Sequence, residues 1–413
     1  MLNMMPERAK SSLAKVMTAL TVVAGAQGVA AVAMPEPEVN VDEHESFDGY
    51  ALFVPGVANA YWTTIQTYTI LGSSYNTANS SFDPIFGYTD IQTEIPGPTE
   101  EEIRAAEQAE MKAEMEAVTK VVCNTQRVFF FLSRIANNDI HKRMGDLRDN
   151  TAEEGVWLRS YGGDGDMEGG MDYKMLGIQG GYDRTYERND GKVIAGLSYL
   201  YTKADFSGMG ADGSGNGNFL GVYGSFIGNK GHYIDAIMKY GRMSNEITAT
   251  DDNTRKTYSG DTSSNGLNTS LEYGYRQQLK SGYYIEPQVE LNYSRMDGDT
   301  FYMSNGSRID MQGSDSLVGR AGFNFGRKVD KGNFYLTCSL LREFIGENTT
   351  YMTYKTLHDK ATADFKDTWM EYGIGFNFQT APQQNLYGEL TRTALADKLS
   401  ENWRVNLGYR WSF

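Results

Sequence analysis

Strict alternation of apolar and polar residues is the feature of this sequence that most restricts its fold. In the C-terminal segment 403–413, apolar side chains occupy every second position, and polar or small residues occupy the positions between them. Segments 267–276 and 285–294 repeat the pattern. A period of two is typical of β-strands with one apolar face, because successive side chains point to opposite sides. The alternation begins near Gly155 and predicts an all-β fold from there to Phe413.

The connections between these segments alternate in length. The short ones are Glu187–Asp190, Gly228–Gly231, Lys280–Gly282, Val329–Asn333 and Thr380–Asn385. The long, polar ones are Lys203–Asn218, Thr248–Gly266, Met296–Asp315 and Gly346–Asp367. Short turns at one rim and long loops at the other are typical of outer-membrane barrels, whereas a soluble sandwich has no reason to keep this order. We therefore predict a twelve-stranded antiparallel barrel, counted as about twelve segments, with both of its ends on the periplasmic side.

The polar faces of the predicted strands carry charges suited to a wet lumen. By alternation, the lumen-facing charged residues are Glu286, Glu290, Arg320, Glu371, Arg404 and Arg410. The formal net charge of -15 and the lack of a basic patch argue against nucleic acid as a partner. Cys123 and Cys338 show no metal-ligand spacing, and no cofactor or metal is expected. They are not expected to be disulfide-bonded, because Cys338 alternates onto the lipid face.

The N-terminal third of the chain reads as three segments. Residues 1–33 have a basic start, an apolar stretch and an Ala-Val-Ala pattern at 31–33, which together predict a secretory signal peptide. Residues 34–98 are poor in Lys and Arg, contain no internal repeat, and are interpreted as a short passenger or linker segment. Residues 99–146 are predicted to form a linker helix through the barrel, and residues 147–413 to form the barrel domain.

The helix prediction rests on its ends. Thr99 and Glu102 form a capping box, and Gly145 is a suitable stop. A helix of this length exceeds the thickness of a bilayer, so we expect a break near Cys123-Asn124-Thr125. The first half, rich in Glu and Lys, is also compatible with a solvated stalk. Segment 128–132, Val-Phe-Phe-Phe-Leu, is apolar and requires a partner surface.

The order of several motifs resembles one known family. Segment 141–149, HKRMGDLRD, and segment 155–159, GVWLR, resemble the helix-to-first-strand junction of the translocator β-barrel of monomeric (type Va) autotransporters. Segments 176–183, 285–291 and 319–322 resemble later strands of the same domain. The aromatic C-terminal end, with Tyr409, Trp411 and Phe413, resembles the family's barrel-assembly signal. The resemblance spans about residues 138–413.

This resemblance implies a barrel threaded by the preceding helix and the secretion of whatever precedes that helix. It implies assembly with the help of periplasmic chaperones and the barrel-assembly machinery, and a location in the bacterial outer membrane in contact with its lipid. The N-terminal segment would lie at the cell surface, and a monomer is expected. Family members usually carry a long repetitive passenger, so the short segment 34–98 does not support adhesin, protease or esterase activity.

The family also implies one reaction, in which an Asn side chain cyclises onto its own carbonyl and releases the passenger. The matching position, four residues before Lys142-Arg143, is Asn138, followed by Asp139. The alternative is a structural role, in which Asn138 caps or breaks the helix. We prefer this role because the negative charge of Asp139 would oppose the developing oxyanion of the cyclisation. The four histidines, His44, His141, His232 and His358, have no obvious Ser or Asp partners for a hydrolase.

The sequence thus predicts a non-enzymatic translocator of a type V secretion system that displays or exports its own short N-terminal segment. The alternative is a helix-plugged porin or structural barrel without a role in secretion. Lumen arginines would hold acidic helix residues in the first case and select anions in the second.

Overall fold

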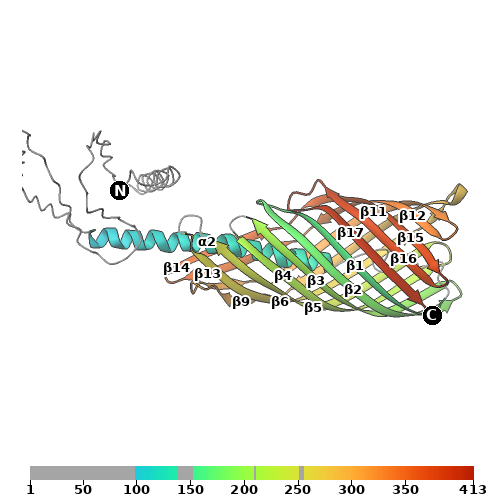
Figure 1. Cartoon of the computed structure of the whole chain (residues 1–413), viewed down its shortest axis with the longest axis horizontal. Coiled ribbons are helices and arrows are strands. Elements are labelled where there is room, and N and C mark those ends of the chain that lie inside the picture. Colours follow the sequence, from blue (N-terminus) through green and yellow to red (C-terminus); the bar gives the residue numbers. More distant parts are fainter. Residues whose placement is uncertain (1–97, 137–151, 209–210, 251–254) are drawn as a thin grey trace, which may run out of the picture. The chain divides into compact units, whose positions relative to one another are not determined.

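The fold is a closed antiparallel barrel preceded by one long helix (Figure 1). The computed structural model describes residues 98–136, 152–208, 211–250 and 255–413. The helix is α2 (Glu100–Ala136). The barrel strands are β1 (Glu154–Met167), β2 (Met171–Arg188), β3 (Gly191–Gly208), β4 (Ala211–Gly228), β5 (His232–Thr250), β6 (Thr257–Tyr275), β8 (Tyr283–Met296), β11 (Ser314–Val329), β12 (Gly332–Glu343), β15 (Thr368–Ala381), β16 (Gln384–Ala394) and β17 (Leu399–Ser412). The chain divides into units Met1–Ile103 and Arg104–Phe413, and the second contains the barrel.

The ring closes where the last strand meets the first. β17 pairs with β1 from Gly155↔Ser412 to Met167↔Leu399, and every other barrel strand pairs with its nearest barrel neighbours in sequence. Backbone hydrogen bonds tie Glu154 to Phe413 in both directions, at 3.1 and 2.9 Å. The prediction of a twelve-stranded antiparallel barrel is confirmed. Among the described residues, none of the helices combines the length and the apolarity that a helical membrane span requires.

One rim carries the short connections that the sequence predicts. These are residues 189–190, 229–231, 330–331 and 382–383, together with the β6–β8 connection, which holds β7 (Gln277–Gln278) and the 3-10 turn η2 (Lys280–Gly282). At the other rim, the prediction of long loops at 203–218 and 248–266 is wrong. β3 and β4 run on to Gly208 and from Ala211, and β5 and β6 run on to Thr250 and from Thr257. The strands continue because their inward residues, such as Phe206, are buried in one apolar cluster with the side chains of α2.

The other two long connections form a second, four-stranded sheet. Its strands are β9 (Asp299–Tyr302), β10 (Arg308–Met311), β13 (Glu347–Tyr354) and β14 (Leu357–Asp364), in the order β14-β13-β10-β9. The Glu343 carboxylate fixes the point where β13 leaves the barrel. Its Oε1 accepts backbone N–H groups of Leu317, Ile345 and Gly346 at 2.9–3.2 Å, and its Oε2 accepts the Ser316 hydroxyl. A buried carboxylate that accepts this many hydrogen bonds holds the turn rigidly.

Glycines on the inner face leave room for tyrosine rings from neighbouring strands. At seven glycines an added Cβ would overlap such a ring. The pairs are Gly165 with Tyr173, Gly177 with Tyr161, Gly196 with Tyr223, Gly274 with Tyr233, Gly326 with Tyr284, Gly375 with Tyr335, and Gly408 with Tyr387. At these positions glycine and tyrosine therefore have a common packing cause.

Helix α2 begins as the sequence predicts and continues where a break was predicted. Thr99 N and Oγ1 donate to the Glu102 carboxylate at 2.7 and 2.9 Å, and Glu102 N donates back to Thr99 Oγ1 at 3.2 Å. These bonds lower the pKa of Glu102. The predicted break at 123–125 is wrong, because Thr125 donates its hydroxyl to the Val121 carbonyl within an unbroken helix. The predicted continuation of the helix to residue 146 lies outside the described residues beyond Ala136.

Candidate functional site: a helix held in the barrel lumen

The polarity of the barrel wall inverts along its strands. In the middle of β2, Leu176 points outward and is well exposed, while Gln179 points inward and is buried. Closer to the long-loop rim, Lys174 points outward and Tyr173 points inward. Because side-chain direction alternates without interruption, only the residue types change. The apolar face therefore passes from the outside of the wall to the inside.

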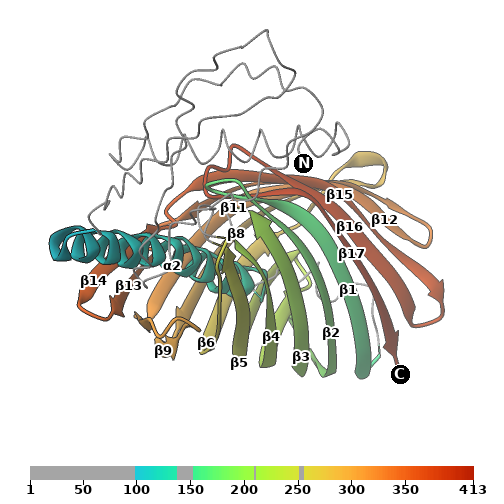
Figure 2. The ribbon, with the colours of Figure 1, turned by 60° about the vertical axis from the view of Figure 1, so that its left-hand side comes forward.

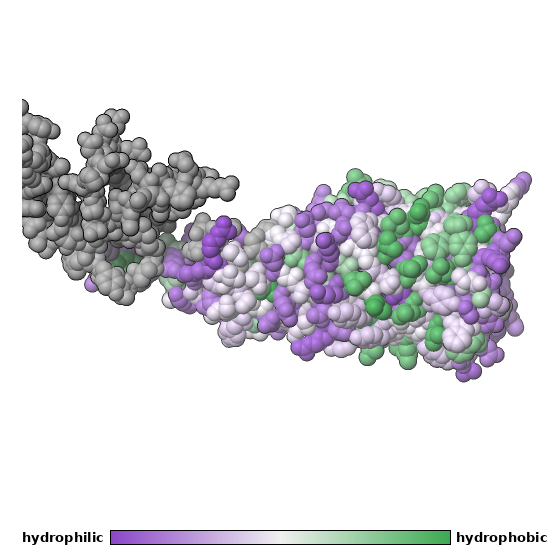
Figure 3. Space-filling view, viewed as in Figure 1, coloured by the Kyte–Doolittle hydropathy of each residue, from purple (hydrophilic) through white to green (hydrophobic). Residues whose placement is uncertain are grey.

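The same inversion occurs on β5. Tyr240 lies outside and Lys239 inside, whereas Arg242 lies outside and Met243 inside. Apolar outer surface accordingly gathers over the half of the barrel near the C-terminus (Figure 3). We call this outer apolar surface the belt. The ends of β1–β6, β8 and β17 at the long-loop rim, together with the small sheet and Phe365 beside it, have an apolar inner lining, and we call them the sleeve. A wall that is apolar outside suits lipid, and a wall that is apolar inside requires an occupant.

Helix α2 is that occupant. Its side chains become buried from Glu114 onward, and Figures 1 and 2 show the helix running into the ring of strands. Segment 128–132 finds the partner surface that its composition requires. Phe130 stacks on Phe365 with ring centroids 4.2 Å apart, and Phe131 lies 4.3 Å from Tyr173. Burial of these rings contributes on the order of 2 kcal/mol each.

Polar contacts fix the helix along its length. Thr119 donates to Asp359 Oδ2 at 3.1 Å, and Gln126 Nε2 donates to both Asn348 Oδ1 and Thr350 Oγ1 at 2.6 Å. Deeper in the lumen, Ser133 donates to Asn268 at 2.8 Å. At the end of the described helix, Lys239 Nζ donates to the carbonyl of Ala136. A hydrogen bond from a cation to a backbone carbonyl is charge-assisted, so it holds this part of the helix strongly.

An ion-pair clasp holds α2 at the outer mouth of the sleeve. Lys256, which immediately precedes β6, lies 2.6 Å from Glu110 and 3.3 Å from Glu114. The hydrogen bond with Glu110 raises the pKa of Lys256. Burial raises the pKa of Glu114, but hydrogen bonds from Tyr354 and Lys256 outweigh it, so the pKa of that carboxyl is lowered. Both shifts favour the charged forms that make the clasp.

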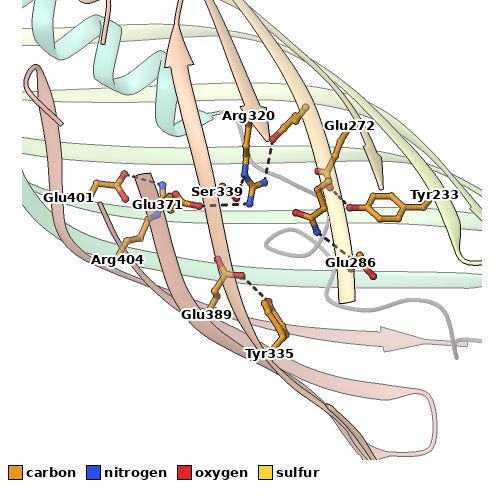
Figure 4. A network of polar contacts seen from close by, with 12 residues as sticks. Tyr233, Glu272, Glu286, Arg320, Tyr335, Ser339, Glu371, Glu389, Glu401 and Arg404 are labelled. Carbon is orange, nitrogen blue, oxygen red and sulfur yellow. Dashed lines mark hydrogen bonds and ion pairs between the residues drawn. The ribbon is translucent and has the colours of Figure 1, made fainter. Parts of the chain in front are cut away.

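The lumen below the sleeve holds a network of paired charges (Figure 4). All six charged residues that alternation assigns to the lumen point inward. Arg320 reaches Glu290 at 3.5 Å and Glu371 at 4.0 Å, and Arg404 reaches Glu371 at 2.9 Å. Glu286 pairs with Arg276. Burial of paired charges in low dielectric fixes side-chain geometry more than it adds stability.

One helix residue joins this network. The guanidinium of Arg134 lies 3.7 Å from the ring centroid of Trp369, which is buried on β15. Its charge interacts favourably with Glu401 and Glu371 and unfavourably with Arg404. The end of α2 is therefore seated by a cation–π contact beside an acidic part of the wall.

The seam between the first and last strands carries its own ion pair. Arg410 on β17 makes two parallel contacts with Asp183 on β2, at 2.6 and 2.8 Å, and both side chains are fully buried. Asp183 also accepts from Tyr223, which accepts from Trp157 Nε1, each at 2.7 Å. The pair crosses β1 at Gly155, where a Cβ would lie 2.7 Å from Arg410 Cζ.

The remaining predicted positions are divided between the outer surface and the residues that the structure does not describe. Tyr409, Trp411 and Phe413 lie on the outer face of β17 and are exposed. Asn138, Asp139 and the junction 141–149 lie outside the described residues. Cys123 on α2 and Cys338 on β12 are free. In the described ranges, His, Cys, Asp and Glu side chains nowhere come together in threes as metal ligands would.

Sequence reasoning missed Asp183, Lys239, Arg134 and Trp369. Asp183 and Lys239 continue the inward alternation of β2 and β5, so the same rule that selected Glu286 would have found them. No local pattern marks Arg134 or Trp369, because their pairing depends on how deeply the helix enters the barrel.

Comparisons with known proteins agree with this geometry. The family model of the autotransporter beta-domain matches residues 156–391. The probable autotransporter YcgV of Escherichia coli K12 is 32% identical over 302 residues, covering 70% of this chain and 31% of YcgV. The pertactin autotransporter of Bordetella bronchiseptica is 28% identical, covering 67% of this chain and 31% of pertactin. This chain therefore spans about a third of the length of these relatives.

Solved structures share the fold. The beta domain of the Bordetella autotransporter BrkA has a TM-score of 0.52 and 26% identity, with 63% of this chain and 100% of that domain covered. The translocator domain of NalP from Neisseria meningitidis has a TM-score of 0.55 at 15% identity, with 73% and 99% covered, and supports the fold alone. The family match, which covers more than half of the chain, and the lumen geometry lead to one conclusion: the chain belongs to the autotransporter family, and its barrel is an outer-membrane translocator domain of a type V secretion system.

Proposed function

We propose that this barrel carries the N-terminal part of its own chain across the outer membrane and then holds it at the cell surface. The observation that supports the proposal is α2, which fills the sleeve with matched contacts from Glu110 to Ala136. From Ala136 back to Arg104, the part of α2 in the same unit as the barrel, the helix runs toward the rim opposite the short turns. A chain held in this way connects the barrel to whatever precedes Glu100.

We further propose that the segment stays tethered and that the barrel itself catalyses no reaction. The contacts of α2 suit a lasting plug, since Thr119, Gln126 and Ser133 each donate a hydrogen bond to the wall. His232 contacts Tyr273, and His358 contacts Thr353, each between exposed residues of adjacent strands. Such surface pairs are ordinary turn contacts. The porin alternative would leave the N-terminal segment in the periplasm.

Protease shaving of intact cells tests the proposal. An epitope placed between residues 40 and 95 is expected to be digested on intact cells, while a periplasmic control protein survives. An epitope that is digested only after the outer membrane is opened would refute export and favour the porin alternative.

Mass spectrometry of outer membranes tests whether the segment stays attached to the barrel. A fragment that starts at Asp139 in the native chain, and is missing in Asn138→Ala, would contradict it.

We also propose that the C-terminal aromatic residues contact the assembly partners of the barrel. The outward, exposed positions of Tyr409, Trp411 and Phe413 leave them accessible to periplasmic chaperones and to the barrel-assembly machinery before insertion, and to lipid afterwards. A monomer is proposed, because the closed ring has no unpaired barrel edge to share with a second copy.

A further inference from the structure

Methionine is concentrated on the inner wall of the sleeve. The apolar cluster around α2 includes twenty-two wall side chains, and eight of them are methionine. The exposed large apolar side chains of the described residues number forty-one, with Met238 the one methionine among them. Leucine shows the opposite preference, with two in the sleeve wall and twelve on the outside. Both sets belong to one chain, and most members lie on the same barrel strands, so chain composition cannot account for the difference.

These methionines come from several strands of the sleeve and pack in one cluster with the helix. They come from β1, β2, β5, β8, β10 and β13 and from the β9–β10 turn. Three of them pack over glycines of other strands. A Cβ added at Gly163 would lie 3.0 Å from Met175 Cε, one added at Gly266 would lie 3.1 Å from Met243 Cε, and one added at Gly260 would lie 2.6 Å from Met303 Sδ. Without a Cβ beneath it, a side chain with three rotatable bonds can change its path.

A wall that had only to seat the finished helix would favour a different composition. Leucine, isoleucine and valine have well-defined rotamers and specify one shape, whereas methionine specifies shape poorly and adapts to many. Surfaces that bind unrelated sequences use flexible, methionine-rich linings for this reason. The wall therefore suits an occupant whose shape changes.

The chain that precedes α2 supplies such an occupant. Segment 34–98 contains bulky Phe53, Trp62 and Phe86 among many Ser, Thr and Gly residues, unlike the Val- and Phe-rich face of α2. If this segment is exported, each of its residues passes the wall that now holds the helix.

We propose that the methionine lining is the contact surface for the unfolded N-terminal segment of this same chain during its passage, and adapts to each residue in turn. The inference rests on the proposed export function and adds to it the surface that the moving chain contacts. Thioethers that rearrange around aromatic and small side chains alike keep the lumen filled without any single position binding tightly.

The test compares two sets of substitutions in the full chain. The first set is Met175→Leu, Met243→Leu, Met303→Leu and Met352→Leu, which keeps volume and removes flexibility. The matched control set is Leu200→Ile, Ile247→Leu, Ile309→Leu and Leu399→Ile, at other buried positions of the same sleeve. Each is combined with the native segment 34–98 or with a Gly/Ser-only replacement of it. Protease-accessible epitope is measured per folded barrel, with heat-modifiable gel mobility as the measure of folding.

The methionine set is expected to display the Gly/Ser segment within about twofold of the unsubstituted barrel and the native segment about tenfold less, because stiff branched side chains obstruct bulky residues. The control set should display both normally. Equal display of both segments by the methionine set, or the same loss in the control set, would overturn the inference while leaving export intact. Failure of the unsubstituted barrel to display either segment would refute export itself. If the fourfold variant does not fold, the double variant Met175→Leu, Met352→Leu is read in the same way, with about a threefold loss expected.

Discussion

Neutralising Asp183 should destabilise the barrel far more than neutralising an equally close ion pair on its outer surface. Asp183 and Arg410 are fully buried and joined by two contacts of 2.6 and 2.8 Å, so Asp183→Asn leaves the guanidinium charge inside the wall without its counter-ion. The loss of one partner of such a pair costs about 3–5 kcal/mol. Tyr223 can still donate to the new amide oxygen, which places the expected cost near the lower end of this range, at about 3 kcal/mol.

A control is available in the same protein. Lys203 and Asp205 lie 2.8 Å apart on the outer face of β3, and about half of each side chain is exposed. Asp205→Asn should therefore cost less than about 1 kcal/mol. Urea unfolding of the purified barrel in lipid vesicles, followed by tryptophan fluorescence, measures both variants.

Two further variants distinguish the effect of the unpaired Arg410 charge from the effect of the space that its guanidinium occupies. Asp183→Asn combined with Arg410→Met removes both charges and should recover a good part of the loss, because no unpaired charge remains. Gly155→Ala should mimic the single variant, since its methyl group would overlap the guanidinium. If Asp183→Asn costs no more than Asp205→Asn, or if the double variant is no more stable than Asp183→Asn alone, the buried pair does not hold the seam.

Three further predictions concern the helix in the lumen, the outer clasp and the C-terminal residue. Deletion of residues 125–136 should raise single-channel conductance in planar bilayers, because the helix fills the passage; unchanged conductance would place the helix outside. Acidification below about pH 4 should loosen the outer clasp, because a carboxyl with a lowered pKa, such as Glu114, contributes stability above its unfolded pKa and loses it as the pH falls through its folded pKa. Proteolysis of residues 104–114 should then increase at low pH, and Lys256→Met should abolish most of that pH dependence; an unchanged pH profile in this variant would argue against the clasp. Removal of Phe413 should reduce the amount of heat-modifiable, folded barrel severalfold without changing the stability of the fraction that assembles, and a normal yield would argue against an assembly signal.

The alternation of apolar and polar residues predicts most of the fold, because one rule fixes both faces of every strand. This rule predicted the barrel and the inward direction of the Arg410 side chain. It did not identify the partner of Arg410, because that depends on the stagger between β17 and β2, two strands far apart in the chain. Local pattern contains no information on that stagger.

The sleeve was missed for a different reason. The alternation continues through Lys203-Ala204-Asp205-Phe206, but a charged outer face looks like a loop when the belt is taken as the end of the barrel. Only an occupant of the lumen makes an inward Phe206 favourable in a segment whose outer face is in water. The predicted break at 123–125 failed likewise, since burial in the lumen outweighed the weak helix propensity of Asn and Thr.

The placement of contacts along α2 has a mechanical consequence. A force that pulls a displayed segment away from the cell would act along the helix axis, and the contacts at Glu110, Thr119, Gln126 and Ser133 are spaced along that axis. They would bear the load side by side, in shear, rather than being peeled apart one after another. Rupture would then require many contacts to fail together, so the anchorage resists drag in flowing fluid better than the strength of any single contact suggests.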